Sequence, residues 1–452
     1  MSLLTSAFAQ VGQIASQRAV HSALGWLHLH EQQVMRWQRE CVAIPAPPFG
    51  EAERARWMAA RFAELQLAEV HIDEAGNVLG LLGGEAAAQG PVIVLSAHMD
   101  TVFPGDTPLR PSLTGTRLHA PGACDNGAGL AALLAIAAAL RHAAIQPLCR
   151  VFFIGNVGEE GEGDLRGVRH MYAHAPWRAG VAAHLVLDGA GQTTAVTGAL
   201  GSRRFEVMLS GAGGHSWTDA GRPNPIAALS DAITRLGQRQ AALSSSLSSS
   251  RTLAREGESG LSRSTYSGTY RSTWNVGTIE GGSAVNAIPA TATGRFDLRS
   301  TDADELPRLE AELQRAVEEA VLAANAGVPA EHALRSSIRM IGDRPAGALP
   351  EDARMLALLR AVDRHLGLRT ELRTASTDAN IPLSLGVEAI SLGGGGEGGG
   401  VHTTGEWFDA RGRDLGLRRI LLLLLALADC HAPALREADG EPDGEPDGAL
   451  EP

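Results

Sequence analysis

Two histidines and several carboxylates stand at separate places in the sequence where each could bind a cation. His98 and Asp100 lie in Ser-Ala-His-Met-Asp-Thr-Val, and Asp125 lies in Gly-Ala-Cys-Asp-Asn-Gly-Ala-Gly. Residues two apart on an extended chain point to the same side, so Asp100 can hydrogen-bond one imidazole nitrogen of His98 while the other faces a metal. Asp125 can bridge two cations, beside glycines that let the backbone approach a ligand. Each has an ordinary explanation too: His-x-Asp is more often a structural pair, and Asp often caps a helix.

Glu159, Glu160, Asp188 and His402 complete this set of candidate ligands. Glu159 and Glu160 are adjacent in the sequence, and neighbouring carboxylates repel each other unless a cation or a proton relieves the repulsion. Asp188 follows His-Leu-Val-Leu, and His402 follows the glycine cluster 393–400. A solvated acidic turn or a flexible glycine loop would explain each segment taken alone. Together, two histidines and several carboxylates are ligands suited to zinc, cobalt or manganese.

Buried strands precede most of these residues. Residues 91–97, 150–155 and 184–187 are short apolar runs of strand length, typical of strands buried on both faces of a sheet. Residues 52–65 and 130–140 have helical patterns. Strands that alternate with helices predict an α/β fold with a doubly wound, mostly parallel sheet. The candidate ligands fall at the carboxyl ends of the strands, where ligand sites of such sheets lie.

A second kind of unit interrupts this alternation. The expected elements after residue 199 are strands at 205–210, 270–279 and 291–298 and helices at 225–235 and 303–324. They predict an α+β unit with half-exposed antiparallel strands. The helix and strand alternation then returns from residue 351. We therefore expect a discontinuous metal-binding domain of residues 1–199 and 340–452 and an inserted domain of residues 200–339.

Three segments have distinctive compositions. Residues 244–267 are rich in serine and bury little apolar surface, so we expect a mobile loop. The tail 437–452 is acidic and rich in Pro and Gly, which predicts disorder. Residues 420–427 are apolar but far shorter than the roughly 20 residues of a spanning helix, so we expect a buried C-terminal helix.

The bulk properties exclude several classes of protein. The net charge of −12 argues against a nucleic-acid partner, because such proteins concentrate Lys and Arg to neutralise phosphates. The N-terminus has no early Lys or Arg and too short an apolar run for a signal peptide, so we interpret it as mature sequence. The four cysteines form no CxxC pair, which favours neither a disulfide framework nor a thiolate zinc site. We expect a cytoplasmic protein without a membrane partner.

The ordered series of candidate ligands resembles one known family. His98-x-Asp100, Asp125, Glu159-Glu160, Asp188 and His402 occur in the order found in the M20 metallopeptidases. This group includes glutamate carboxypeptidase, tripeptide aminopeptidase (peptidase T) and the acetylornithine and succinyl-diaminopimelate deacylases. The resemblance covers about residues 37–428, nearly the whole chain.

The resemblance implies a role for each of these residues and two divalent metal ions, zinc first, with cobalt or manganese as alternatives. Asp125 would bridge the two metals. Glu160 and His402 would complete one metal site, and His98 and Asp188 the other. Glu159 would be the general base, and Asp100 the partner of His98. The family also implies a cis peptide bond between Asp125 and Asn126.

The inserted domain matches the family's lid, which also mediates homodimerisation. His215, in Gly-Ala-Gly-Gly-His-Ser, matches the lid histidine that reaches the partner subunit's active site and polarises the scissile carbonyl. Asn286 and Arg299 match the lid residues that hold the polar end of the substrate. Both also have structural explanations, because Asn286 can cap a turn and Arg299 can pair with Asp297.

The implied activity is hydrolysis of peptide or amide bonds in small peptides or N-acyl amino acids, by a water that bridges the metals and a glutamate base. The motif around Glu159 and Ser376-Thr377-Asp378 is similar to the peptidase branch. Aminopeptidase, carboxypeptidase, dipeptidase and N-acyl amino-acid hydrolase all stay open. The alternatives from other classes are a catalytically silent homologue that binds metals and a small molecule or peptide, and a dimerisation scaffold. The complete ligand set with Glu159 favours an enzyme.

Overall fold

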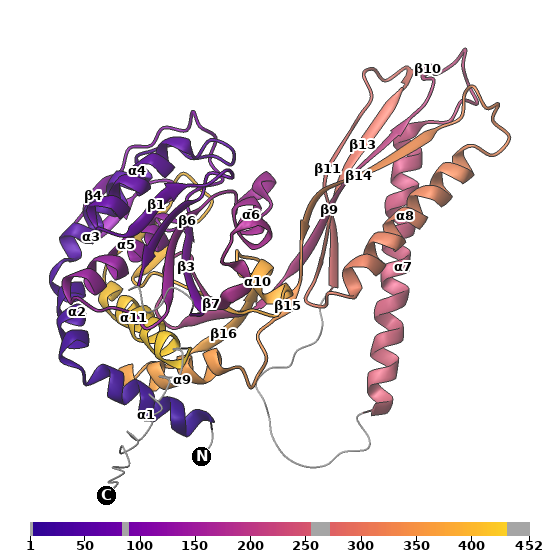
Figure 1. The fold of residues 1–452 in the computed structure, drawn as a ribbon. Coiled ribbons are helices and arrows are strands. Elements are labelled where there is room, and N and C mark those ends of the chain that lie inside the picture. Colours follow the sequence, from indigo (N-terminus) through magenta and orange to yellow (C-terminus); the bar gives the residue numbers. More distant parts are fainter. Residues whose placement is uncertain (1–2, 84–89, 255–271, 432–452) are drawn as a thin grey trace, which may run out of the picture.

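The structure, a computed structural model, describes residues 3–83, 90–254 and 272–431. Figure 1 shows a larger α/β unit beside a narrower unit that consists of a long sheet with two helices. The larger unit is built from both the N-terminal and the C-terminal parts of the chain. The narrower one, called the inserted unit below, runs from strand β9 to strand β14. The first expected boundary, 199/200, falls between β8 and β9, whereas the second, 339/340, falls inside β14.

A nine-stranded sheet forms the centre of the larger unit. Its order is β1-β2-β6-β3-β7-β17-β8-β15, with β16 paired to β8. The strands are β1 Ala68–Ile72, β2 Val78–Leu82, β3 Val92–His98, β6 Arg150–Asn156, β7 Val181–Leu187, β8 Thr194–Ala199, β15 Gly347–Ala348, β16 Glu371–Ala375 and β17 Glu388–Leu392. The central strands β6, β3, β7 and β17 are parallel to one another. Strand β3 is buried along its whole length, as its apolar run predicts.

Helices cover both faces of this sheet, which confirms the doubly wound α/β class. They are α1 Leu3–Ala15, α2 Arg18–Leu29, α3 Glu31–Val42, α4 Ala52–Glu64, α5 Gly127–His142, α6 Arg166–His174, α9 Arg354–Leu366, α10 Asn380–Ser384 and α11 Arg413–Cys430. One face packs against a core that includes α5 and α11, and the other packs against α6. Helix α5 is apolar on all sides because it lies between β3 and the helices α2, α3 and α11. The predicted apolar helix at 420–427 lies within α11 and is buried.

The inserted unit is a four-stranded antiparallel sheet of order β11-β13-β9-β14. Its strands are β9 Gly201–Ser210, β11 Ser272–Gly281, β13 Thr291–Ser300 and β14 Arg335–Arg344, and its helices are α7 Pro225–Ala254 and α8 Glu305–Ala324. Both helices contribute to the core on one face of the sheet. At its far tip, β10 Gly214–His215 pairs with β12 Ala287–Ile288 (Figure 1).

A further small sheet of four strands, not predicted from the sequence, carries the glycine cluster. Its order is β18-β19-β5-β4, with β18 Glu397–Gly399, β19 Trp407–Asp409, β5 Arg117–His119 and β4 Ser112–Thr114. The short 3-10 helices η2 Gly161–Gly163 and η3 Arg178–Gly180 complete the described elements. The turn between β18 and β19 contains His402, so this sheet holds one of the candidate ligands.

The serine-rich segment corrects one prediction. Residues 244–254 belong to α7, where we expected a mobile loop. A helix that is already formed gains one hydrogen bond for each residue added, so it can extend through serines that would not start one. The remaining part, 255–267, and the tail 437–452 lie outside the described residues. In the described part of the chain, no helix combines the length and apolar character needed to cross a membrane.

Candidate metal centre

The candidate ligands converge at the carboxyl ends of neighbouring parallel strands. His98 is the last residue of β3, Asp188 directly follows β7, and Glu160 lies in the loop after β6. Asp125 precedes α5, and His402 lies in the turn between β18 and β19. Parallel strands end at the same edge of a sheet, so ligands far apart in sequence meet there.

The two oxygens of Asp125 face two different groups of ligands. Asp125 Oδ1 lies 3.0 Å from His98 Nε2, and Asp188 Oδ1 lies 3.7 Å from the same nitrogen. Asp125 Oδ2 lies 3.1 Å from His402 Nε2, which is 3.0 Å from Glu160 Oε1. Within each group, one donor atom from every residue lies within 4.8 Å of the others. The carboxylate of Asp125 therefore occupies the position of a bridge between two cation sites.

The chemistry of these groups fits metal binding. The Nδ1 atom of His98 lies 3.0 Å from the carbonyl oxygen of Asp100, so a proton on Nδ1 can donate there and leave Nε2 free as a ligand. Asp125 Oδ1 is buried and makes no well-aligned hydrogen bond, although His98 Nε2 is close. Bonds of about 2.0–2.2 Å to one zinc ion place neighbouring ligand atoms roughly 3–3.5 Å apart. The contacts at 3.0–3.1 Å fall in this range, and that of Asp188 with His98, at 3.7 Å, is slightly longer.

The charges of the bare site show what a cation would neutralise. Burial lowers the pKa of His98, but its contacts with Asp100, Asp125 and Asp188 outweigh burial and raise that pKa well above its usual value. The hydrogen bond to Asp125 raises the pKa of His402 to about 9. Burial opposes ionisation of Asp125, yet the two histidines hold its pKa below the usual range. Without metal, protons on the histidines supply the positive charge that the carboxylates require.

Glu159 lies beside these groups without belonging to either. Its side chain is buried, and Arg344 Nη1 donates to Glu159 Oε1 at 3.0 Å. Arg344 Nη2 also donates to the backbone carbonyl of Glu159. Burial raises the pKa of Glu159 well above its usual value, against the attraction of Arg344 and His98. A buried carboxylate that binds no metal can accept a proton, as a general base must.

Asp100 supports the site differently from the simple carboxylate-imidazole pair that its spacing suggests. The nearest Asp100 acceptor to His98 Nδ1 is the backbone carbonyl, and Asp100 Oδ1 is 3.7 Å away. The Asp100 carboxylate instead accepts hydrogen bonds from the backbone N–H groups of Glu159, at 3.0 Å, and Glu160, at 2.7 Å. Asp100 therefore fixes the loop that presents both glutamates as well as the imidazole.

The peptide bond between Asp125 and Asn126 is cis. Asn126, and not Asp125, caps helix α5: its Oδ1 accepts from the backbone N–H of Gly129 at 3.0 Å. Its amide also donates to Leu187 O at 2.8 Å. The ordinary reading of Asp125 as the helix cap is therefore wrong, and the Asp125 carboxylate is free to face the two ligand groups.

Comparisons with known proteins agree with this geometry. The model of the peptidase family M20/M25/M40 matches residues 94–426. The chain belongs to this family. Among solved structures, the M20-type fold recurs in a tripeptidase from Staphylococcus aureus, with a TM-score of 0.68, 20% identity and coverage of 88% of this chain and 99% of that one. A Bacillus subtilis protein described as a dinuclear metal binding peptidase of the M20 family has a TM-score of 0.62 and 16% identity, covering 88% and 98%.

Curated relatives match over a shorter stretch. A protein described as a LysW-lysine/LysW-ornithine hydrolase from Pyrococcus abyssi is 33% identical over 135 residues, which is 30% of this chain and 36% of that protein. The chain thus matches only about a third of the length of this relative. The M20 assignment rests on the family model over residues 94–426, and the solved structures share the fold.

Two of the three predicted lid residues, His215 and Asn286, do not lie at the metal ligands of this M20 chain. His215 is exposed in β10 at the far tip of the inserted unit (Figure 1). The exposed residue Asn286 is next to it, since the N–H of Ser216 donates to Asn286 O at 2.9 Å. Arg299 lies in β13 and pairs with Asp297 at 2.7 Å, which is the structural alternative. The structure brings His215 and Asn286 together but leaves both apart from the metal centre.

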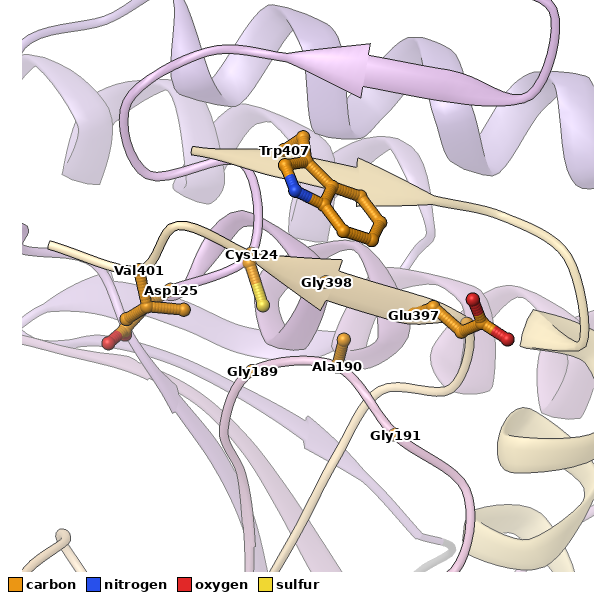
Figure 2. Close-up of a pocket in the computed structure, with 10 residues that line it drawn as sticks. Cys124, Asp125, Gly189, Ala190, Gly191, Glu397, Gly398, Val401 and Trp407 are labelled. Carbon is orange, nitrogen blue, oxygen red and sulfur yellow. The ribbon is translucent and has the colours of Figure 1, made fainter. Parts of the chain in front are cut away.

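A cavity of about 530 Å³ opens beside Asp125. Figure 2 shows strand β18 and the loop of Gly189 and Gly191 on either side of it, with Trp407 above. Glycine is required at position 398, because a Cβ there would overlap the Sγ of Cys124. The charged side chains that line the cavity, Asp125 and Glu397, are both acidic.

Sequence reasoning missed several residues that support the site. Arg344 pairs with Glu159 from the end of β14, and no local pattern marks it. Asp378 is fully buried, accepts a hydrogen bond from the Asn156 amide at 2.7 Å, and has a pKa raised by burial to about 7. Its motif, Ser376-Thr377-Asp378, is similar to the peptidase branch but predicts no role for this residue. Glu406, four residues after His402, is also buried, and its position near a candidate ligand was the available signal.

The root of the inserted unit is bonded to the loop that carries the two glutamates. Besides the Arg344 contacts, the N–H of Asp343 donates to Asp164 Oδ1 at 3.1 Å, and Arg169 donates to Asp343 O. Arg204 in β9 donates to Gly161 O at 3.1 Å. Three residues of two strands therefore hold one loop of the larger unit.

Proposed function

We propose that this M20 protein is a two-metal hydrolase that cleaves peptide or amide bonds of small peptides or N-acyl amino acids, with Glu159 as the general base. The observation that carries the proposal is the position of Asp125, whose two oxygens face separate groups, one with His98 and Asp188 and one with Glu160 and His402. A carboxylate in a structural ion pair needs only one partner. A carboxylate that bridges two cations needs each of its oxygens to face a separate group of ligands, as those of Asp125 do.

Two divalent cations bound there would lower the pKa of a water and polarise the substrate carbonyl. Glu159 takes the proton of the attacking water on its carboxylate. Because Glu159 binds no metal in this assignment, it can return the proton to the leaving nitrogen. Arg344 keeps the carboxylate of Glu159 in place during both transfers.

The proposed substrate occupies the cavity beside Asp125. Its volume of about 530 Å³ suits a small peptide or an acylated amino acid. Since its charged side chains are acidic, the cavity favours a neutral or basic group over an anionic one. The curated relatives described as hydrolases of LysW-lysine and LysW-ornithine support a basic residue at this position.

We also propose that two copies of the chain form a homodimer through the inserted unit. His215 is too far along the inserted unit to reach the metal ligands of its own chain in this arrangement (Figure 1). In the described part of the chain, strand β11 is bonded on one side only, to β13, so we place the second chain at its other edge. In such a dimer, His215 and Asn286 would complete the site of the partner subunit, where His215 stabilises the oxyanion.

The test compares wild type with Glu159→Gln, an isosteric variant that keeps an oxygen for Arg344. Wild-type protein loaded with zinc, cobalt or manganese should hydrolyse members of a panel of dipeptides and N-acyl amino acids. Glu159→Gln should lose about 100- to 10,000-fold in kcat while its metal content by elemental analysis stays at the wild-type value. Substantial activity of the variant would remove Glu159 from the base role, and a wild type inactive on every substrate would favour the silent binding protein.

A further inference from the structure

Glu406 is a buried acid whose partners are backbone groups. Its side chain is 1% exposed. Its Oε1 accepts hydrogen bonds from the N–H groups of Cys124, at 2.7 Å, and Asp125, at 2.8 Å, and its Oε2 accepts one from Gly122 at 3.0 Å. Among the residues that the structure describes, no Lys, Arg or His side chain forms an ion pair with it. Three converging N–H groups stabilise its charge in place of a cation.

These bonds join two segments that each carry a proposed metal ligand. The three donors belong to the loop that ends in the bridging residue Asp125. Glu406 itself belongs to the turn that presents His402, and its own N–H donates to Thr403 O at 3.2 Å. The N–H of Ala120 donates to Glu406 O at 3.1 Å, which adds a backbone link between the same segments. The side chain of Glu406 thus connects the loop that ends in Asp125 to the turn that carries His402.

A carboxylate suits this position better than an amide. Both oxygens of Glu406 accept, and one of them accepts twice. A glutamine would place an NH2 group against at least one backbone N–H, so two donors would face each other and the loop would have to move. The loop cannot move without shifting Asp125, because the N–H of Asp125 is one of the donors.

We infer that Glu406 is a positioning residue of the metal centre: it fixes the distance between the Asp125 carboxylate and the His402 imidazole so that both can bind the same cation. This inference rests on the proposed two-metal centre. It assigns Glu406 no contact with substrate or metal. Its effect passes through the backbone of the Asp125 loop and the His402 turn.

The test measures metal affinity in place of activity. Metal-free wild type and Glu406→Gln are titrated with Zn²⁺ against a chelating indicator, and thermal unfolding of each is recorded with and without the metal. Loss of a group that orients metal ligands costs about 10- to 100-fold in affinity, so Glu406→Gln should bind at least one Zn²⁺ that much more weakly. Glu406→Asp, which keeps the charge but is one methylene shorter, should also bind more weakly.

The matched control is Glu388→Gln. Glu388 likewise accepts backbone hydrogen bonds, from Arg354 N at 3.1 Å and Met355 N at 2.8 Å, but at the start of α9, away from the ligands. Its variant should keep wild-type Zn²⁺ affinity even if it lowers the melting temperature.

The outcomes separate the two levels of the argument. If wild type binds no divalent metal, the proposed metal centre fails. If wild type binds and both Glu406 variants bind with affinities within twofold of it, the positioning role fails. If both variants are unfolded where metal-free wild type is folded, Glu406 holds the fold and the positioning role is again overturned.

Discussion

The ion pair between Arg344 and Glu159 gives the sharpest quantitative prediction. Arg344→Met keeps much of the side-chain volume but removes the donor that lies 3.0 Å from Glu159 Oε1. Both side chains are at most 8% exposed, so water cannot replace the lost partner. Breaking a buried pair in this way costs about 3–5 kcal/mol. Part of that cost is avoided if Glu159 takes up a proton. Because the protonated carboxyl cannot act as a base, the same substitution should change both stability and activity.

The sign of the pH effect follows from the cause of the pKa shift. Burial raises the pKa of Glu159, and Arg344 opposes it, so removal of Arg344 raises that pKa further. The base must be deprotonated to act, so kcat of Arg344→Met should fall at neutral pH and recover as the pH rises. The acidic limb of the pH profile should therefore move to higher pH than in wild type.

The assay is a pH series of kcat with the metal-loaded enzyme, together with urea unfolding of the metal-free protein. Arg373→Met is the control, because Arg373 is exposed and pairs with Glu371 at the surface. It should leave both the pH profile and the urea midpoint unchanged. An Arg344→Met enzyme with the wild-type pH profile and the wild-type midpoint would refute the reasoning.

Three further predictions concern the metal ligands and the helix cap. Removal of metal with a chelator should abolish activity and lower the melting temperature, and Zn²⁺ should restore both. His402→Ala should reduce bound zinc from two ions to one by elemental analysis, because Asp188 and His98 keep the other group. In the metal-free protein, the raised pKa of His402 stabilises the fold fully below about pH 6.5, and this stabilisation should be lost as the pH rises through about 9. The melting temperature of metal-free His402→Ala, measured over the same pH range, should lack this pH-dependent decrease. Asn126→Ala should destabilise by about 1–3 kcal/mol in denaturant unfolding, since it removes the cap of α5 and leaves Leu187 O without its donor.

The strands and the ligands they carry could be predicted because both depend on local pattern. The apolar run at 91–97 became β3 and ends at His98, and the runs before Glu160 and Asp188 became β6 and β7. Parallel strands of one sheet end at one edge, so the meeting of these residues follows from the strand assignment alone.

Contacts between segments distant in sequence could not be predicted in this way. Arg344 meets Glu159 across 185 positions, and nothing in the residues around Arg344 distinguishes it from a surface arginine. The helix cap also illustrates the limit. Asp125 and Asn126 are both good cap residues, and only the backbone path shows that Asn126 takes this role. The length of α7 was not predicted, because a serine-rich composition indicates that a segment buries little apolar surface but does not show whether a helix continues through it.

The bonds at the root of the inserted unit restrict how the two units can move. The loop between Glu159 and Asp164 is hydrogen-bonded to three residues of the inserted unit, Asp343, Arg344 and Arg204. If the inserted unit swings as a rigid body, it must either break these bonds or pull the base and the ligand Glu160 along with it. Opening and closing of the molecule would then displace Glu159 and Glu160 directly. A bending motion that leaves these two residues in place must occur in the parts of β9 and β14 farther from the larger unit.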